Sequence, residues 1–273
     1  MNYTDIFAPV KKNFSKKAKK MKKTLKNIFI TGASSGLGKA LAIEMACPDV
    51  CLIICGRNKE RLYETGAICR EKGAEVITYL FDVTDAFAAQ EAILDADSQH
   101  PIDLLIANAG ISGGVLGEPE GGAQTRQIFN TNVFGVANCV LPALERMRKR
   151  KSGQIAVIAS IAGYRGLPSA PAYSASKACV KAWGEALRGW LMPENIKVNV
   201  VCPGFIKTPL TDKNAFKMPF LMQPEKAARI IAKGIKKNKA IIAFPWPMAF
   251  AAWLMSALPA CIIHPLLRHL PKK

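Results

Sequence analysis

The stretch "NIFITGASSGLG", residues 27–38, joins a short apolar strand to the start of a helix through a glycine-rich turn. Gly32, Gly36 and Gly38 follow the strand in the spacing G-x-x-x-G-x-G. Glycines at such a turn let the backbone approach a pyrophosphate, which the helix N-terminus attracts. A tight connection without a ligand is the alternative, but the strand–turn–helix setting favours dinucleotide binding. The predicted contacts of the turn are Gly32, Ser34, Ser35, Gly36, Leu37 and Gly38.

Strands and helices continue to alternate after this turn. The segments predicted as strands are residues 27–31, 50–56, 74–82, 102–110, 153–160, 196–204 and 240–244. Helical segments separate them, for example residues 37–46, 58–73 and 90–97. Apolar strands alternating with helices predict a parallel sheet with right-handed crossovers, covered on both faces. No internal repeat or low-complexity linker interrupts the block, so residues 27–244 are predicted to form one doubly wound, Rossmann-like α/β domain.

Composition agrees with one folded domain in a reducing compartment. The chain has 273 residues, of which 50% are hydrophobic and 21% are charged, and this length allows a substantial core. Eight cysteines are present, mainly within apolar runs, and no C-x-x-C pair occurs. Cys47, Cys51 and Cys55 lack histidines at metal-ligand spacing. We therefore expect buried free thiols, a cytoplasmic location and no metal site.

The net charge of +18 is concentrated at the N-terminus. Residues 1–26 contain nine lysines and one aspartate. Such a run is typical of a solvated, disordered tail, although it could also contact phosphates or an anionic membrane. It lacks the apolar region of a signal peptide. A start at Met21, which would leave only "MKKTLK" before the first strand, is the alternative to a functional tail.

The end of the second strand indicates which dinucleotide is bound. An acidic residue there would bind the ribose 2′-hydroxyl of NAD(H), but residues 55–58 contain no carboxylate and place Arg57 there instead. A guanidinium suits a 2′-phosphate. The sequence therefore predicts NADP(H) over NAD(H), unless Arg57 is an ordinary exposed loop residue.

Taken together, the motifs make residues 27–243 similar to the short-chain dehydrogenase/reductase family, in its main single-domain group. The similarity rests on the glycine turn, "FDVTD", "ANAG", "NTNVFG", "ASIAG", "YSASK" and "CPGFIKT", all in the family's order. Ala107 departs from the family pattern, because it replaces the first Asn of the N-N-A-G motif. The resemblance implies NADP(H) contacts by Asp82, Val83, Asn108, Ala109, Gly110, Pro203, Gly204, Ile206 and Thr208 in addition to the turn.

The resemblance also implies a catalytic tetrad that transfers a hydride between the cofactor and a carbonyl. Tyr173 and Lys177 are four residues apart, so they lie on one face of a helix, and both also match cofactor contacts of the family. Tyr173 is expected to exchange the proton, with its pKa lowered by the Lys177 ammonium and the nicotinamide ring. Ser160 is expected to hydrogen-bond the substrate oxygen, and Asn132 to position a water that links Lys177 to solvent. Separately, each could be a structural residue.

The substrate is predicted to be a hydrophobic carbonyl compound. In this family the segment after the sixth strand, here "KTPLTDKNAFKMPFLM", commonly closes over the substrate, and here it is apolar without a charged cluster for a head group. The apolar residues of this segment are Phe216, Met218, Phe220, Leu221 and Met222, and Phe205 just before it is also apolar. Tyr164 lacks a lysine at i+4 and is expected to line the pocket.

The C-terminal segment, residues 245–273, favours contact with a membrane. No Lys, Arg, Asp or Glu occurs between Lys239 and Arg268, and Trp246, Trp253 and Pro259 lie in this gap. A run broken by proline suits the bilayer interface better than a span, which would place the protein peripherally on the inner face of a membrane. The alternative is a pair of helices that forms a lid or a dimer contact.

Three other functions are alternatives to the reduction of a lipid-like ketone. A soluble reductase of a small polar or sugar-like carbonyl is one, and a sensor that binds NADP(H) without catalysis is another, although the complete tetrad disfavours it. Nucleic-acid binding is disfavoured because the lysines lack interleaved aromatics and lie outside the fold. We expect a homo-oligomer, either a dimer or a tetramer.

Overall fold

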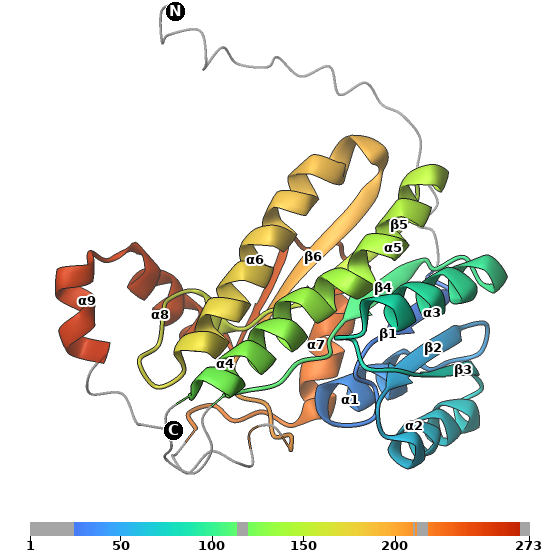
Figure 1. Ribbon diagram of the computed structural model, residues 1–273, viewed down its shortest axis with the longest axis horizontal. Coiled ribbons are helices and arrows are strands. Elements are labelled where there is room, and N and C mark those ends of the chain that lie inside the picture. The colour runs from blue at the N-terminus through green and yellow to red at the C-terminus, as the bar shows by residue number, and fades with distance from the viewer. Residues whose placement is uncertain (1–24, 114–119, 210, 212–217, 268–273) are drawn as a thin grey trace, which may run out of the picture.

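A parallel sheet of seven strands forms the centre of the molecule (Figure 1). The computed structural model describes residues 25–113, 120–209, 211 and 218–267. Strand order is β3-β2-β1-β4-β5-β6-β7, and every neighbouring pair is parallel. The predicted Rossmann-like α/β fold is therefore confirmed. Most of the predicted basic tail, residues 1–24, lies outside the described residues.

All seven predicted strands are present, but each is shorter than predicted. They are β1 (Asn27–Ile30), β2 (Cys51–Gly56), β3 (Glu75–Leu80), β4 (Leu104–Ala107), β5 (Gly153–Ile158), β6 (Ile196–Pro203) and β7 (Ile241–Phe244). β2 and β4 are buried along their whole length, as strands covered on both faces should be. Beyond the carboxyl ends of β4 and β5 the chain leaves the sheet, so residues 108–110 and 159–160 can line a site.

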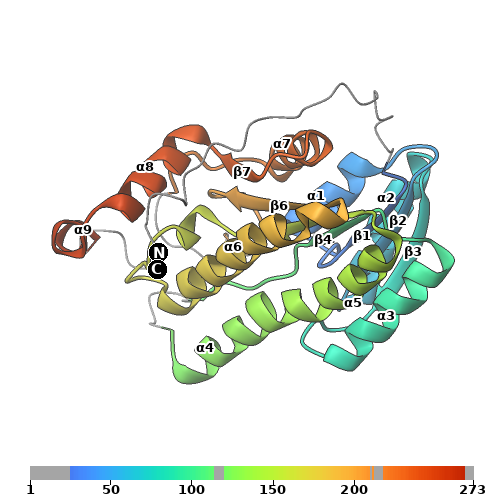
Figure 2. The ribbon, with the colours of Figure 1, turned by 90° about the horizontal axis from the view of Figure 1, so that it is seen from above.

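Helices cover both faces of the sheet (Figure 2). One layer consists of α1 (Gly36–Met45), α2 (Lys59–Glu71) and α7 (Pro224–Lys236), which share a core cluster with β1, β2 and β6. The other layer consists of α3 (Ala86–Gln99), α5 (Gly135–Arg150) and α6 (Pro171–Leu191). Helix α3 begins earlier than predicted, because Asp85 caps it by accepting a hydrogen bond from the Ala88 amide at 3.0 Å.

A π-helical segment, Asn130–Phe134, joins α4 (Gly122–Phe129) directly to α5. Such wide turns often occur at functional sites because they rotate side chains out of the regular helical spacing. Here the turn directs Asn132 inward, where the residue is fully buried. Two short 3-10 helices, η3 (Ile161–Gly163) and η4 (Met192–Glu194), flank α6 along the chain.

The chain order reverses between β1 and β4. After β1, β2 and β3 extend the sheet in one direction, and β4 then adds to the other side of β1. At such a switch point the connections leave in opposite directions, so a crevice opens at the carboxyl ends of the strands. The glycine turn after β1 lies at this crevice.

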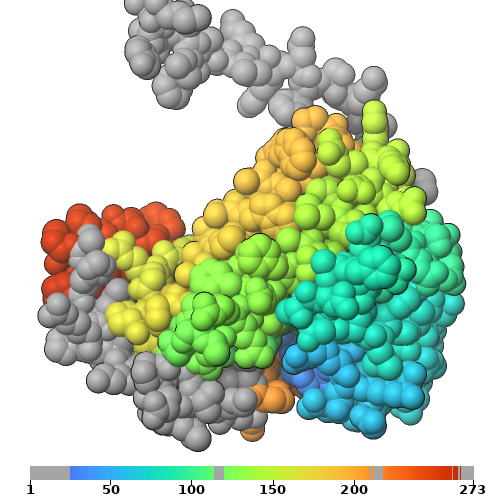
Figure 3. Space-filling view, viewed as in Figure 1, coloured from blue at the N-terminus to red at the C-terminus, as the bar shows by residue number. Residues whose placement is uncertain are grey.

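Two helices follow the last strand and project from one end of the molecule (Figures 1 and 3). They are α8 (Trp246–Ala257) and α9 (Ala260–Leu267), separated at Pro259. Within the part of the chain that the structure describes, no helix has both the length and the apolar character needed to cross a bilayer.

Candidate active site

A cavity of about 1330 Å³ opens at the carboxyl ends of the strands. All predicted site residues except Asn132 line it, including the glycine turn, Arg57, Asp82 and Val83, residues 108–110, Ser160, Tyr173, Lys177, Pro203, Gly204, Ile206 and Thr208. Ala107 is not among the lining residues; it is buried in β4, in the core. The sequence motifs therefore meet in one place.

The glycine turn has a shape that only glycine allows. Gly32 and Gly36 have φ values of +67° and +53°, which residues with a Cβ rarely adopt. A Cβ at Gly38 would lie 2.1 Å from the carbonyl oxygen of Gly32. Ser35, the N-cap of α1, makes no side-chain hydrogen bond to the helix, so the first amides of α1 face the cavity without a side-chain cap. The turn thus fits the pyrophosphate of a dinucleotide.

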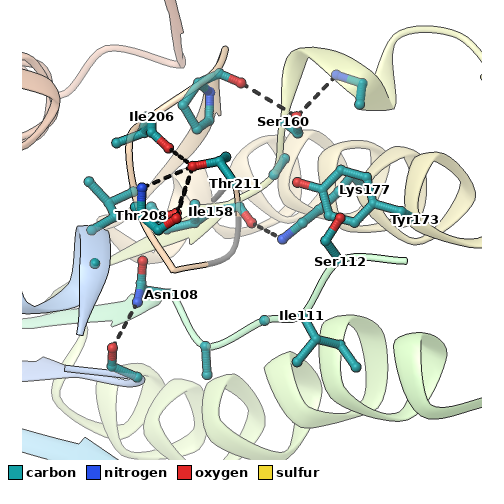
Figure 4. Close-up of a pocket in the computed structure, with 18 of the residues that line it drawn as sticks. Asn108, Ile111, Ser112, Ile158, Ser160, Tyr173, Lys177, Ile206, Thr208 and Thr211 are labelled. Carbon is teal, nitrogen blue, oxygen red and sulfur yellow. Dashed lines mark hydrogen bonds between the residues drawn. The ribbon is translucent and has the colours of Figure 1, made fainter. Parts of the chain in front are cut away.

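Asn108 fastens β4 to this turn. Its backbone amide donates to the Thr31 hydroxyl at 2.9 Å, and its side-chain amide donates to the Thr31 carbonyl at 2.9 Å. Its side-chain amide also donates to the Gly32 carbonyl at 3.3 Å, and Figure 4 shows a hydrogen bond from the Asn108 side chain. Asn108 therefore holds the two sides of the crevice together, which the motif alone did not reveal.

Arg57 and Asp82 form an exposed ion pair at the ends of β2 and β3. Arg57 Nη1 lies 3.1 Å from Asp82 Oδ2. Burial raises the pKa of Asp82, but hydrogen bonds from Thr84 and Arg57 outweigh this effect, so the pKa is lowered overall. Asn58 and Arg61, at the start of α2, line the cavity next to this pair. Sequence analysis missed Arg61, although it lies only one helical turn after Arg57.

Ser160, Tyr173 and Lys177 lie together at the other side of the cavity (Figure 4). The Ser160 hydroxyl accepts from the Ala162 amide at 3.1 Å, and it also contacts the Pro203 carbonyl at 3.4 Å and the Tyr173 hydroxyl. The Lys177 ammonium donates to the Ile158 carbonyl at 2.9 Å and lies 5.8 Å from the centre of the Tyr173 ring. The two hydroxyls therefore share a position where a substrate oxygen can bind.

Burial governs the pKa values of this group. It lowers the pKa of Lys177 to about 8, because the charged form loses hydration. It also raises the pKa of Tyr173, while the hydrogen bond with Ser160 acts in the opposite direction. In the protein without cofactor, burial thus raises the pKa of Tyr173. The charges of Lys177 and of a bound nicotinamide ring are expected to act in the opposite direction.

Asn132 lies behind the cavity wall and positions its backbone. Its side-chain oxygen accepts from the Ile111 amide at 2.8 Å, and its side-chain nitrogen donates to the Ile111 carbonyl at 2.9 Å and to the Ser176 hydroxyl at 3.0 Å. A Cβ on Gly110 would lie 3.0 Å from the Asn132 oxygen and 3.4 Å from the Lys177 nitrogen. Asn132 therefore lies close to Lys177, across Gly110.

Glu120 was not predicted, and it caps the catalytic helix. Its carboxylate accepts from the Ala172 amide at 2.5 Å and from the Tyr173 amide at 3.4 Å. The N-cap residue of α6, Ala170, has no side chain that could do this. Because Glu120 is 50 residues from Ala170 in the sequence, no local capping motif could reveal it.

The expected substrate segment lines the cavity only in part. Phe205, Pro219 and Thr211 line it, whereas Phe220 and Leu221 are exposed and Met222 packs on the core. Phe216 lies outside the described residues. Thr211, which was not predicted, shapes this loop by accepting from the Thr208 amide at 2.9 Å and donating to the Ile206 carbonyl at 2.7 Å.

Tyr164 does not line the cavity, contrary to expectation. It packs against the core beneath α6, and the Lys181 ammonium lies 4.8 Å from the centre of its ring. Burial raises the pKa of this phenol to about 12. The expectation rested on the absence of a lysine at i+4, which does not determine where the side chain packs.

Helix α8 forms the remaining wall. Met248, Ala251, Ala252 and Met255, which are spaced as one helical face, line the cavity. A Cβ at Gly204 would lie 3.0 Å from Pro245 Cδ and 3.3 Å from Met248 Sδ. A side chain at position 204 would therefore press against Pro245 and Met248 at the start of α8.

Among the described residues, one group of potential metal ligands lies away from the cavity, near the amino ends of β2 and β3. Ligand atoms of Cys51, Glu75 and His100 are all within 4.8 Å of one another, although the sequence placed no histidine near Cys51. Burial, followed by the charge of Glu75, raises the pKa of Cys51 to about 11. Nothing else in the described residues gives this group a role.

The fold and this site define a class of protein, the oxidoreductases that use a nicotinamide nucleotide. A family model described as short chain dehydrogenase matches residues 26–218. The chain belongs to the short-chain dehydrogenase/reductase family.

Known proteins with similar sequences and structures agree with this assignment. An uncharacterized oxidoreductase of Myxococcus xanthus is 38% identical over 85% of this chain and 92% of its own length. The ketoacyl reductase HetN of a Nostoc species is 33% identical, covering 79% of this chain and 77% of its own. Actinorhodin polyketide ketoreductase, solved with NADPH, has a TM-score of 0.73 and 26% identity, covering 82% of this chain and 97% of its own. A short-chain dehydrogenase from Mycobacterium paratuberculosis, solved with NAD, has a TM-score of 0.70 at 23% identity, covering 81% and 96%.

Proposed function

We propose that this protein uses NADPH to reduce the ketone of a hydrophobic, acyl-chain-bearing substrate at the surface of a membrane. The observation that carries the proposal is the make-up of one cavity. Its nucleotide turn, its two hydroxyls and the apolar face of α8 all border the same space. A ketone held by Ser160 and Tyr173 would have its apolar chain against α8.

In this proposal each member of the tetrad has a separate task. Bound NADPH supplies the hydride. The Ser160 hydroxyl hydrogen-bonds the substrate oxygen, and the Tyr173 phenol donates the proton that turns the reduced carbonyl into an alcohol. Lys177 binds the ribose and favours proton loss from Tyr173 by its charge. Asn132 fixes the backbone at Ile111, beside Lys177.

The protonation states of the protein without cofactor fit the proposed role of Tyr173. Burial raises the pKa of Tyr173, so this phenol carries its proton at neutral pH, as the proposed proton donor must. With a pKa of about 8, Lys177 is largely charged at neutral pH.

The basic residues after β2 support NADPH as the cofactor. Arg57 and Arg61 both line the cavity. The Arg57 side chain is 64% exposed despite its contact with Asp82, so a ligand can reach it. Binding of both cofactors can be titrated calorimetrically for wild type, Arg57→Ala and the control Arg229→Ala, which changes an exposed residue of α7. We expect Arg57→Ala to weaken NADPH binding by about 1.5–3 kcal/mol, the usual value of a charge-assisted contact, and to leave NADH binding unchanged. Equal wild-type affinities for NADPH and NADH would reject the preference.

Two kinds of evidence support an acyl-chain ketone as the substrate. The first is the apolar wall of α8, which suits a hydrocarbon chain better than a sugar. The second is the pair of relatives above whose names specify the reduction of ketoacyl and polyketide substrates. The test is NADPH consumption with long-chain 3-oxoacyl thioesters and ketones, compared with small polar and sugar-like carbonyls. Preference for the polar compounds would favour the alternative reductase, and turnover of none would favour a sensor.

The outer face of α8 supports contact with a membrane. Trp246 is 77% exposed, and Phe250, Trp253 and Leu254 are exposed beside it. The Phe250 and Trp253 rings lie 5.9 Å apart between their centres, so they form one apolar surface. Tryptophans are suited to the bilayer interface, and the net charge of +18 is complementary to anionic lipids.

Flotation with vesicles rich in phosphatidylglycerol tests this surface. We expect the full chain to float with these vesicles and to remain bound in high salt, since salt screens lysines but not apolar contacts. The triple variant Trp246→Ser, Phe250→Ser, Trp253→Ser should float only in low salt. If both proteins stay unbound and only the wild type forms a dimer by light scattering, the surface is a contact between two copies.

A further inference from the structure

Arg165 reaches the substrate side of the cavity from the loop between β5 and α6. It follows Ser160 by five residues, and it lines the same cavity as Tyr173. Its Nη1 donates to the carbonyl of Leu258, the C-cap residue of α8, at 3.3 Å. Arg165 therefore lies where the catalytic loop meets the far end of α8.

The other charges of the cavity lie elsewhere. Among the described lining residues, Arg57, Arg61 and Asp82 belong to the nucleotide end, and Lys177 belongs to the catalytic group. Arg165 is the remaining charged side chain. The lining residues from η3 and α8 beside it are apolar: Ile161, Ala162, Met248, Ala251, Ala252 and Met255. A single cation thus borders an otherwise apolar wall.

This cation has more hydrogen-bonding capacity than its protein contacts use. A guanidinium has five N–H donors in a planar fork, and in the described part of the chain Arg165 donates to Leu258 alone. No carboxylate within the described ranges forms an ion pair with it. A half-buried charge is costly to leave uncompensated, and a bidentate anion would offset that cost.

We propose that Arg165 binds an anionic group of the substrate, a carboxylate or a phosphate, and so selects ketones that carry both an apolar chain and a negative charge. The proposal rests on the reductase function above and adds the head group to it. The eight residues from Met248 to Met255 span about 10 Å along the helix axis. Because Met248 lies by Gly204 and Arg165 binds the C-terminal end of α8, the anion binds at the end of the apolar wall away from the nicotinamide.

The first experiment measures the preference for an anion in turnover. Oxododecanoates with the ketone at positions 3, 6 and 9 are compared with their methyl esters, which lack the charge and carry one additional methyl group, by kcat/KM with NADPH. We expect wild type to prefer at least one acid over its ester by roughly 10- to 100-fold. Arg165→Gln should remove most of this preference, Arg165→Lys should retain part of it, and Arg229→Gln should retain all of it.

The second experiment measures binding without turnover. Octanoate, octyl phosphate and octanol are titrated calorimetrically against the full chain with NADP⁺ present. We expect one or both anions to bind at least about tenfold more tightly than octanol, and the stronger of the two identifies the head group. Arg165→Gln should lose this difference, whereas Arg229→Gln should keep it.

The outcomes separate the two proposals. If wild type shows no preference for acids over esters and none for anions over octanol, the anion site is wrong. It is also wrong if Arg165→Gln lowers kcat/KM equally for acid and ester, since Arg165 then only stabilises α8 through its hydrogen bond to Leu258. If no ketone is turned over but Arg165→Gln abolishes the anion preference in binding, the reductase function fails and the anion site stands.

Discussion

On the nucleotide side of the cavity, backbone atoms determine the shape, whereas on the substrate side the side chains of helix α8 determine it. Gly38 has no room for a Cβ, which would meet the Gly32 carbonyl at 2.1 Å, and Asn108 ties the turn to β4. On the other side, the wall is formed by Met248 and Met255 of α8. Methionine side chains are adaptable. The nucleotide side should therefore tolerate almost no change, while changes on the substrate side should redirect specificity.

The largest effect is expected at the point where the two sides meet. Tyr173→Phe removes the proton donor and should lower kcat by about 10²- to 10⁴-fold, the usual contribution of acid–base catalysis. Cofactor affinity should change little, because the glycine turn, Arg57 and Lys177 are expected to supply most of the contacts to the dinucleotide. Steady-state kinetics and NADPH titration measure the two effects.

Tyr164→Phe is the matched control for that experiment. Tyr164 is outside the cavity, against the core, so its variant should keep kcat within a small factor of wild type. A near-normal kcat for Tyr173→Phe would show that another group donates the proton, and the assignment of the site would have to change.

The next effect tests the rigidity of the nucleotide side. Gly38→Ala places its Cβ against backbone atoms that cannot move aside, so we expect loss of NADPH binding and a destabilisation of about 1–3 kcal/mol, as for overpacking. The control is Gly189→Ala, since a Cβ at Gly189 of α6 meets no atom within 4 Å. That variant should be more stable by about 0.5–1 kcal/mol, because alanine favours a helix over glycine. Urea denaturation and calorimetry supply both readouts, and normal NADPH binding by Gly38→Ala would show that the turn is adaptable.

The same contrast explains how much could be predicted from the sequence. Strand–turn–helix motifs such as "TGASSGLG" specify local backbone geometry, so the doubly wound parallel fold and the residues of the nucleotide side could be predicted from them. Glu120 and Met248 reach the site from distant segments through tertiary packing, and no local pattern marks them. Arg165 is near Ser160 in the sequence, but its contact with the end of α8 is also tertiary. The expectation for Tyr164 was wrong because it rested on the absence of a lysine at i+4, which does not determine where the side chain packs. The burial that raises the pKa of Tyr173 in the protein without cofactor could not be predicted either, because burial is a property of the whole fold.

A smaller effect concerns the pH dependence of stability. The fold lowers the pKa of Lys177 from the ordinary 10.5 to about 8. Between these pH values the unfolded chain binds more protons at this residue than the folded chain does, so the contribution of Lys177 to stability rises with pH. The free energy of unfolding of wild type minus that of Lys177→Met should therefore rise from pH 8 towards 10.5, by roughly 1.4 kcal/mol for each unit of the pKa difference. Urea denaturation at a series of pH values measures it, and a constant difference would contradict a buried, desolvated lysine.

The smallest effect tests whether the two sides are independent. Glu120 follows the loop after β4, and its carboxylate binds the first amides of α6, including that of Tyr173. Removing a cap costs about 1 kcal/mol, so Glu120→Ala should lower the free energy of unfolding by that amount, and Glu120→Gln, which keeps an acceptor oxygen, by less. If the cap also orients Tyr173, kcat measured at full folding should fall for Glu120→Ala and recover in part for Glu120→Gln, with KM for NADPH unchanged. A loss of stability with an unchanged kcat would mean that Glu120 only caps the helix. A fall in kcat would mean that the loop after β4 helps to set the catalytic geometry, so the two sides of the cavity are coupled through the start of α6.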